Sequence, residues 1–139
     1  MNPEQNTIPE PISPEQQQAI QSQLKAITER FLNPDLAKPD MPAVAQELLG
    51  FYHGLSPIQV DYDNPRYKYL EQVKHGKGLS PECAGGCILD SVRTARYLQA
   101  GKAAIDAALE KFDAPVQVLY AGCGPFAPLM LPLLPLYTP

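Results

Sequence analysis

Apolar residues recur along the first half of the chain at the spacing of an amphipathic helix. Successive members lie three or four residues apart, which puts them on one helical face. The first stripe consists of Ile20, Leu24, Ile27 and Phe31, and the second of Val44, Leu48, Phe51 and Tyr52. Ser13 followed by Pro14 can cap and begin the first helix, which should stop at Asn33. The second helix is expected from Asp40 to about Gly54.

The middle of the chain carries further helix signals. An Asn-Pro pair opens a short piece that we expect to be helical over 64–73, before the glycines of "HGKG" break it. Ser80 and Pro81 then repeat the start signal of the first helix. The residues that follow, up to Phe112, are mostly helix formers. They predict one long helix or two consecutive helices.

After Pro115 the pattern changes to that of a buried strand. The sequence "VQVLY" at 116–120 is rich in apolar and β-branched residues, which strands favour. It runs directly into Gly122-Cys-Gly124, and an apolar stretch follows. A strand that leads into Gly-x-Gly and an apolar helix is typical of the start of a nucleotide-binding unit, because glycines let the backbone approach a ligand.

The C-terminal stretch has no charged residue between Val118 and Tyr137, so a membrane helix is one alternative. A span needs about 20 apolar residues in continuous helix. Four prolines interrupt this stretch, and each removes a backbone donor and clashes with the preceding turn. No basic cluster flanks it to set an orientation. We therefore expect no membrane span.

The composition narrows the possible partners and the location. A chain of 139 residues suits one ordinary domain. Its net charge of −4 and pI near 5.1 provide no basic surface, so nucleic acid is not expected as a partner. Residues 1–12 hold too few apolar groups to offset the entropy of ordering them, which predicts a disordered arm. They also lack a basic and apolar signal segment, which predicts a cytoplasmic protein.

Three cysteines, Cys83, Cys87 and Cys123, are the candidate metal ligands or reactive thiols. A structural zinc site needs about four ligands in recognisable pairs. The C-x-x-x-C spacing of the first two, with no second pair, is not that pattern. We therefore expect free thiols and no metal site, and assign no nucleophilic role to Cys123.

The segment "VLYAGCGPF" resembles motif I of the class I S-adenosylmethionine-dependent methyltransferases, which usually reads V-L-D-x-G-x-G-x-G. The match covers Val118, Leu119, Gly122 and Gly124. A tyrosine stands where the family usually has an acidic residue, and Phe126 replaces the third glycine. The resemblance implies that the cofactor S-adenosylmethionine is contacted by Tyr120, Ala121, Gly122, Cys123 and Gly124.

Upstream, "LDSVRTARY" is similar to the D-x-V-R-T-x-x-Y segment of the protein arginine methyltransferases. The arginine of that segment pairs with the carboxylate of the methionine moiety in the family, and Arg93 matches it. The chemistry is suitable, because a planar guanidinium binds a carboxylate through two hydrogen bonds. The alternative is that Asp90 and Arg93, three residues apart, form an ordinary pair on a helix surface.

Together these patterns predict an α/β protein. A helical region at 13–112 leads into the first strand and glycine turn of a Rossmann-like methyltransferase domain at 113–139. Such a site usually takes a second carboxylate about 20 residues after the glycines, and its sheet needs several strands. Neither is found, so we expect the N-terminal portion of a longer methyltransferase, truncated within the helix that follows the glycines.

Alone, this portion should lack most of the packing partners of residues 116–136, bind S-adenosylmethionine weakly or not at all, and transfer no methyl group. A low-micromolar affinity would contradict this expectation. The catalytic residues are not identified, and neither is the methyl acceptor, for which a protein is one possibility. The alternative is a mainly α fold: a small helical protein-interaction module whose hydrophobic C-terminal segment docks on a partner.

Overall fold

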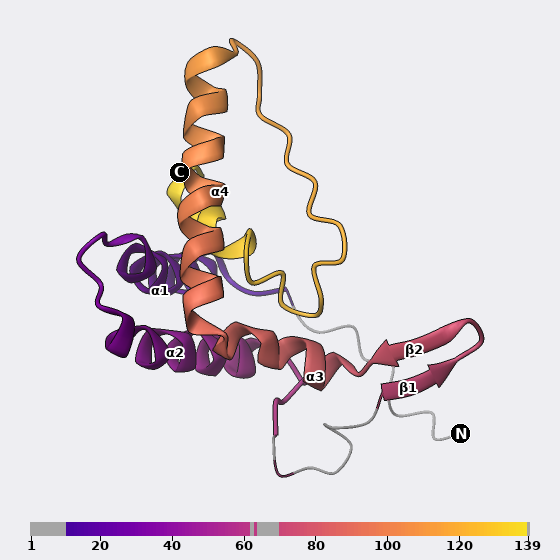
Figure 1. Cartoon of the computed structure of the whole chain (residues 1–139). Helices are drawn as coiled ribbons and strands as arrows, with labels where there is room; N and C mark the ends of the chain where they lie inside the picture. Colours follow the sequence, from indigo (N-terminus) through magenta and orange to yellow (C-terminus); the bar gives the residue numbers. More distant parts are fainter. Residues whose placement is uncertain (1–10, 62, 64–69, 139) are drawn as a thin grey trace.

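The computed structural model describes residues 11–61, 63 and 70–138, and within these ranges the chain is mainly helical (Figure 1). Its α-helices are α1 (Pro14–Leu32), α2 (Met41–Leu55), α3 (Pro81–Gly85) and α4 (Ser91–Lys111). Short 3-10 helices are η2 (Lys38–Asp40), η4 (Gly86–Leu89) and η5 (Leu131–Leu136). The strands β1 (Leu70–Val73) and β2 (Gly76–Leu79) form an antiparallel hairpin. The predicted α/β Rossmann-like fold is therefore wrong, and the mainly α alternative is confirmed.

The helix starts predicted at Ser13 and Ser80 are confirmed by capping hydrogen bonds, and α2 begins after Asp40 as predicted, although the Asp40 side chain makes no capping bond. The Ser13 hydroxyl accepts the Gln16 N–H at 3.2 Å, and the Gln16 side chain accepts the Ser13 N–H at 2.8 Å. This reciprocal pair satisfies two donors that a helix start leaves open. Ser80 caps α3 in the same way by accepting the Cys83 N–H at 3.1 Å. The long region after Ser80 proves to be consecutive helices rather than one.

The expectation of a helix over 64–73 is wrong at its end. Residues 64–69 lie outside the described ranges, but Leu70–Val73 is a strand that pairs with Gly76–Leu79. The pairing places Val73 opposite Gly76, and Gly76 has a φ of +146°. That conformation is open to glycine and not to other residues. The glycine that was expected to end a helix instead allows the chain to turn back as a hairpin.

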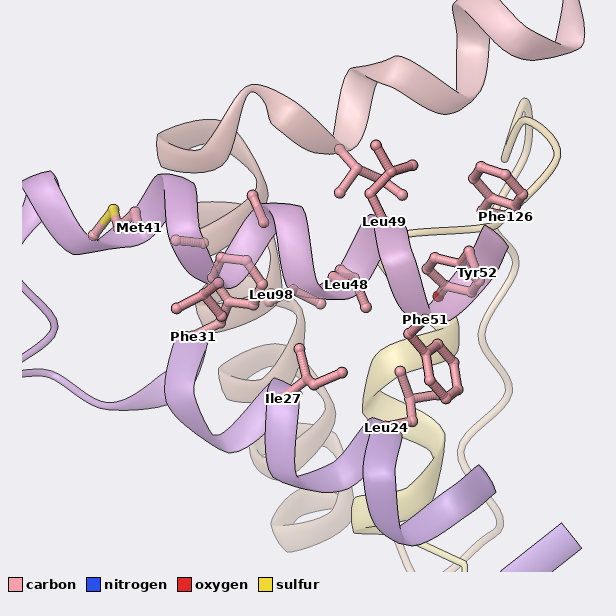
Figure 2. Close-up of a cluster of buried hydrophobic side chains, with 14 of the residues drawn as sticks. Leu24, Ile27, Phe31, Met41, Leu48, Leu49, Phe51, Tyr52, Leu98 and Phe126 are labelled. Carbon is pink, nitrogen blue, oxygen red and sulfur yellow. The ribbon is translucent and has the colours of Figure 1, made fainter. Parts of the chain in front are cut away.

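The core lies where α1, α2 and α4 cross, and it contains both predicted stripes (Figure 2). Ile20 is only partly buried, whereas the other members of the stripes are buried. The middle helices contribute Ile88, Ala95 and Leu98, each at 0% exposure. Burial of these faces removes apolar surface from water, which is the main favourable term in folding.

The C-terminal segment is part of this core and not a free tail. Phe126, Leu129, Pro132 and Leu133 are buried. The expectation that residues 116–136 lack packing partners is therefore wrong for the part after the glycines. In the ranges that the structure covers, no helix is both long enough and apolar enough to cross a membrane.

A buried threonine joins α1 to this segment. The Thr28 hydroxyl lies 2.7 Å from the Leu24 carbonyl and 2.9 Å from the Pro132 carbonyl. Within a 3-10 helix, the carbonyl of Pro132 would accept the N–H of the residue three positions on. That residue is Pro135, which has no N–H. The Thr28 hydroxyl has one proton, shared with the Leu24 carbonyl, and so offers Pro132 a shared hydrogen bond in place of one that the proline-rich helix cannot make.

A polar cluster joins the far end of η5 to α4. The Tyr137 hydroxyl donates to the Asp106 carboxylate at 2.7 Å, and the Lys102 ammonium donates to the same carboxylate at 2.6 Å. The hydrogen bond from Lys102, with that from Tyr137, lowers the pKa of Asp106. Burial, followed by the bond to Asp106, raises the pKa of Tyr137 to about 12. The carboxylate thus stays charged and the phenol stays protonated at neutral pH.

The predicted strand at 116–120 is not formed. Residues 115–120 are extended but pair with no other described segment. Val118 is 53% exposed and Leu119 is 92% exposed. A strand is stabilised by hydrogen bonds and side-chain pairs with a neighbouring strand, and none lies beside it. In the predicted arm, residues 1–10 lie outside the described ranges.

Candidate functional site

The glycine turn that follows the extended segment has a backbone that requires glycine. Gly122 has a φ of +68° and Gly124 a φ of +65°, in the left-handed region that side chains disfavour. A Cβ built on Gly124 would lie 3.9 Å from the Cβ of Ala84 in α3, whereas one built on Gly122 meets nothing within 4 Å. The turn therefore rests against α3 at one glycine and is open at the other.

Arg93 lies in the first turn of α4, on its exposed side. The Asp90 carboxylate accepts the backbone N–H of Arg93 at 3.3 Å and so caps the helix. The ion pairs found in the described chain are Arg30–Glu47 and Lys102–Asp106. The alternative of an Asp90–Arg93 surface pair is thus not what the structure contains. The Arg93 guanidinium therefore forms no ion pair with the Asp90 carboxylate.

The chain path brings the glycine turn back to the start of α4. Figure 1 shows the segment after α4 running back along that helix before the chain reaches η5. Burial raises the pKa of Tyr120, and the positive charge of Arg93 opposes that rise. Arg93 and Tyr120, which are 27 positions apart in the sequence, therefore lie within electrostatic range of each other.

Three further ionisable groups lie within electrostatic range of Tyr120. The Cys123, Cys87 and Tyr97 side chains each act to raise its pKa when they are ionised. Cys87 and Tyr97 were not predicted as site residues. Tyr97 follows Arg93 by four residues and therefore lies on the same face of α4, a spacing that sequence analysis could have used. The position of Cys87 depends on how α3 and η4 pack, which no local pattern reveals.

The remaining predicted site residues give little sign of specific chemistry. Ala121 is exposed. The Cys123 thiol lies 3.4 Å from the carbonyl of Gly124, its own neighbour in the turn. All three cysteines are free thiols of intermediate exposure. No group of three or more His, Cys, Asp or Glu side chains suited to a metal ion occurs in the ranges that the structure describes.

Beside the turn is an apolar cavity of about 270 Å³. It lies between the second half of α4, the extended segment and η5. Its walls include Ile105, Val118, Tyr120, Cys123, Met130 and Leu133. Two predicted site residues thus line the cavity, whereas Arg93 does not. Tyr120 thus lines the apolar cavity and also lies within electrostatic range of the Arg93 cation.

Phe126, which replaces the third glycine of the motif, anchors the turn to the helical core. Its side chain is 3% exposed. The ring stacks on Tyr52 with centroids 5.0 Å apart and planes 7° apart (Figure 2). It also makes an edge-type contact with the His53 ring, with centroids 6.5 Å apart. Stacked and edge-on aromatic pairs add to the free energy gained from burial alone. The departure from the motif therefore has a structural role in this chain.

Gly85 makes room for this ring, and its substitution by alanine is expected to destabilise the protein by about 1–3 kcal/mol. An added Cβ would lie 2.7 Å from Cε2 of Phe126 and 3.1 Å from Cγ2 of Val60. Gly50→Ala is the matched control, because Gly50 lies within α2 and its Cβ would meet nothing within 4 Å. Removing a helical glycine should stabilise by about 0.5–1 kcal/mol. Urea unfolding followed by circular dichroism would contradict the packing argument if both variants gained stability.

Comparison of the chain with protein-family models, with curated proteins and with solved structures finds no match.

Proposed function

We propose that this chain is the N-terminal portion of an S-adenosylmethionine-dependent methyltransferase, and that it supplies one part of the cofactor site. Arg93 would bind the carboxylate of the methionine moiety, while the backbone of residues 120–124 would lie against the cofactor. The observation that carries the proposal is the return of the chain after α4, which brings the glycine turn against α3 and within electrostatic range of Arg93. The glycine turn and the segment of Arg93 are the two that resemble methyltransferase motifs.

Several features of the site support this assignment. The Arg93 guanidinium is exposed and can form two parallel hydrogen bonds with a carboxylate. The side of Gly122 where a side chain would stand is open, so a ligand can approach the backbone closely. The apolar cavity lined by Tyr120 and Cys123 can take an uncharged part of the same ligand.

The chemistry expected of such a site is transfer of a methyl group from the sulfonium to a nucleophile. Its rate depends on holding the donor in line with the acceptor, and some acceptors also need a base. In this proposal, Arg93 and the turn orient the donor. The proposal concerns the site of the methyl donor and assigns no catalytic residue. A protein is one methyl acceptor that it allows.

The proposal predicts weak but localised binding of S-adenosylmethionine to the 139-residue chain. Because Arg93 lies within electrostatic range of the glycine turn, we expect a dissociation constant on the order of 1 mM. In amide NMR spectra, the signals of residues 93 and 120–124 should shift as the ligand is added. Arg93→Ala should abolish these shifts, and Arg93→Lys should weaken them, because an ammonium cannot replace the planar pair of donors.

Two controls separate this site from non-specific binding. Arg96→Ala removes a cation from the same exposed helix, where Arg96 contacts Gln99, and it should leave the shifts unchanged. Methylthioadenosine lacks the carboxylate, so its effects should not depend on Arg93. The proposal is contradicted if millimolar S-adenosylmethionine shifts no signal at the turn, or if Arg93→Ala and Arg96→Ala behave alike.

The alternative function, a helical module that docks through its hydrophobic C-terminal segment, has less support. The apolar residues that would have to be presented to a partner include Phe126 and Leu133, which are 3% and 1% exposed. The exposed apolar residues of this stretch are divided between the extended segment, with Val118 and Leu119, and η5, with Leu131 and Leu134.

A further inference from the structure

A second apolar cavity lies between the first half of α1, the end of α2 and the C-terminal segment. Its volume is about 370 Å³, within the range of about 300–1,000 Å³ that small-molecule sites occupy. The walls are formed chiefly by Ile20, Leu24, Phe51, Leu55, Leu131 and Leu134. None of the described residues that line it is charged. Arg93 is not among them, so the cavity is distinct from the proposed methyl-donor site.

One wall contains a polar group that the protein does not satisfy. Tyr52 lines the cavity and is 4% exposed, and its hydroxyl is covered and has no hydrogen-bond partner among the described residues. The ring is held by Phe126, stacked at 5.0 Å, and by the edge of Phe51 at 5.5 Å. Figure 2 shows the hydroxyl directed towards Phe51, which also lines the cavity. Buried hydroxyls in native proteins nearly always have a partner.

We propose that this cavity binds a small neutral molecule with an apolar body and one carbonyl oxygen, which accepts the hydrogen bond that Tyr52 does not make to any described residue. The apolar walls select an apolar body, because polar groups would lose hydration without gaining partners. The absence of charge on the lining residues selects a neutral ligand for the same reason. The tyrosine hydroxyl contributes its proton, so the matching group is an acceptor.

Access to the hydroxyl requires a small movement of a lining side chain, because the oxygen is covered. Leu55 is one lining residue that is free to move. This residue is the last of α2, lines the cavity and is 51% exposed. Exposed side chains change rotamer on a picosecond to nanosecond timescale, so its displacement leaves the buried core intact.

The test uses benzophenone and diphenylmethane, two neutral molecules that differ only in the carbonyl group. Titration of the full chain, followed by amide NMR, should give saturable shifts at residues that line the cavity. Benzophenone should bind about 3- to 10-fold more tightly than diphenylmethane, the factor expected for one net hydrogen bond. The inference is overturned if neither probe gives saturable shifts at the cavity, or if both bind the wild-type chain equally.

Tyr52→Phe assigns the preference to the hydroxyl. The substitution removes an unpaired buried oxygen, so the variant should be at least as stable as the wild type, and it should bind the two probes alike. Tyr97→Phe is the matched control, because Tyr97 is 55% exposed and does not line the cavity; it should keep the preference. A preference that survives in Tyr52→Phe overturns the inference. So do cavity signals that change with protein concentration alone, which would make a second copy the occupant.

Discussion

Phe126→Ala is expected to lower the free energy of unfolding by about 3–5 kcal/mol. The ring is 3% exposed and stacks on Tyr52 with centroids 5.0 Å apart. Gly85, which faces the ring, has no side chain that could move into the gap. Removal of the ring therefore leaves a cavity, and the loss includes both burial and aromatic contact. Urea unfolding followed by circular dichroism measures the change.

Phe112→Ala is the control for this prediction. Phe112 is 55% exposed at the end of α4, where the Lys111 ammonium lies 5.3 Å from the ring centre. Its loss should change stability by no more than about 0.5 kcal/mol. If the two phenylalanine variants were equally stable, Phe126 would not be the anchor of the glycine turn. Weaker binding of S-adenosylmethionine by Phe126→Ala is a further expectation, because the turn would lose its support.

Leu133→Ala is the second large effect, with an expected loss of about 2–5 kcal/mol. Leu133 is 1% exposed and packs against Gly101 of α4. A Cβ on that glycine would lie 3.1 Å from Cδ1 of Leu133 and 2.9 Å from Cε of Met130. Because Gly101 has no side chain, α4 and the C-terminal segment can pack closely at this point. Shortening Leu133 would leave a void at this contact.

Leu119→Ala is the matched control from the same charge-free stretch. Leu119 is 92% exposed, so its truncation should change stability by no more than about 0.5 kcal/mol. Thermal or urea unfolding of both variants tests whether the stretch is divided into an exposed part and a core part. Equal losses at the two leucines, or none at either, would contradict that division.

The helices of this protein were predictable because their signals are local. The Ser13 and Ser80 caps, each followed by proline, mark helix starts through hydrogen bonds that span three residues. The apolar stripes of α1 and α2 indicate which face is buried, because apolar residues that recur every 3.6 positions form one helical face that packs against the core. These features needed no knowledge of which helix covers which.

The strand at 116–120 was predicted wrongly for a related reason. Its β-branched residues favour the strand conformation, but a strand forms only when a neighbouring strand completes its backbone hydrogen bonds. No such neighbour lies beside residues 115–120 in the described chain. The opposite error occurred at 70–73, where pairing with residues 76–79 makes a strand that the local pattern did not indicate.

The candidate site was predicted only in part. The glycines at 122 and 124 could be identified from their spacing, and their positive φ values agree with a turn that needs glycine. Arg93 was selected by resemblance. The electrostatic effects of Arg93 and Cys87 on Tyr120, and the stacking of Phe126 on Tyr52, depend on how segments far apart in the sequence are packed. Their use in binding S-adenosylmethionine stays a prediction.

The sequence by itself determined where α1 and α2 begin and which of their faces is buried, because capping and helical periodicity act within a few residues. Only the tertiary structure decided which residues of the charge-free C-terminal stretch are buried and which are exposed. Leu119 and Leu133 are the same residue type in the same apolar run, yet one is exposed and the other is in the core. The difference arises because η5 packs on α1 and α4, through Thr28, Gly101 and the burial of apolar surface.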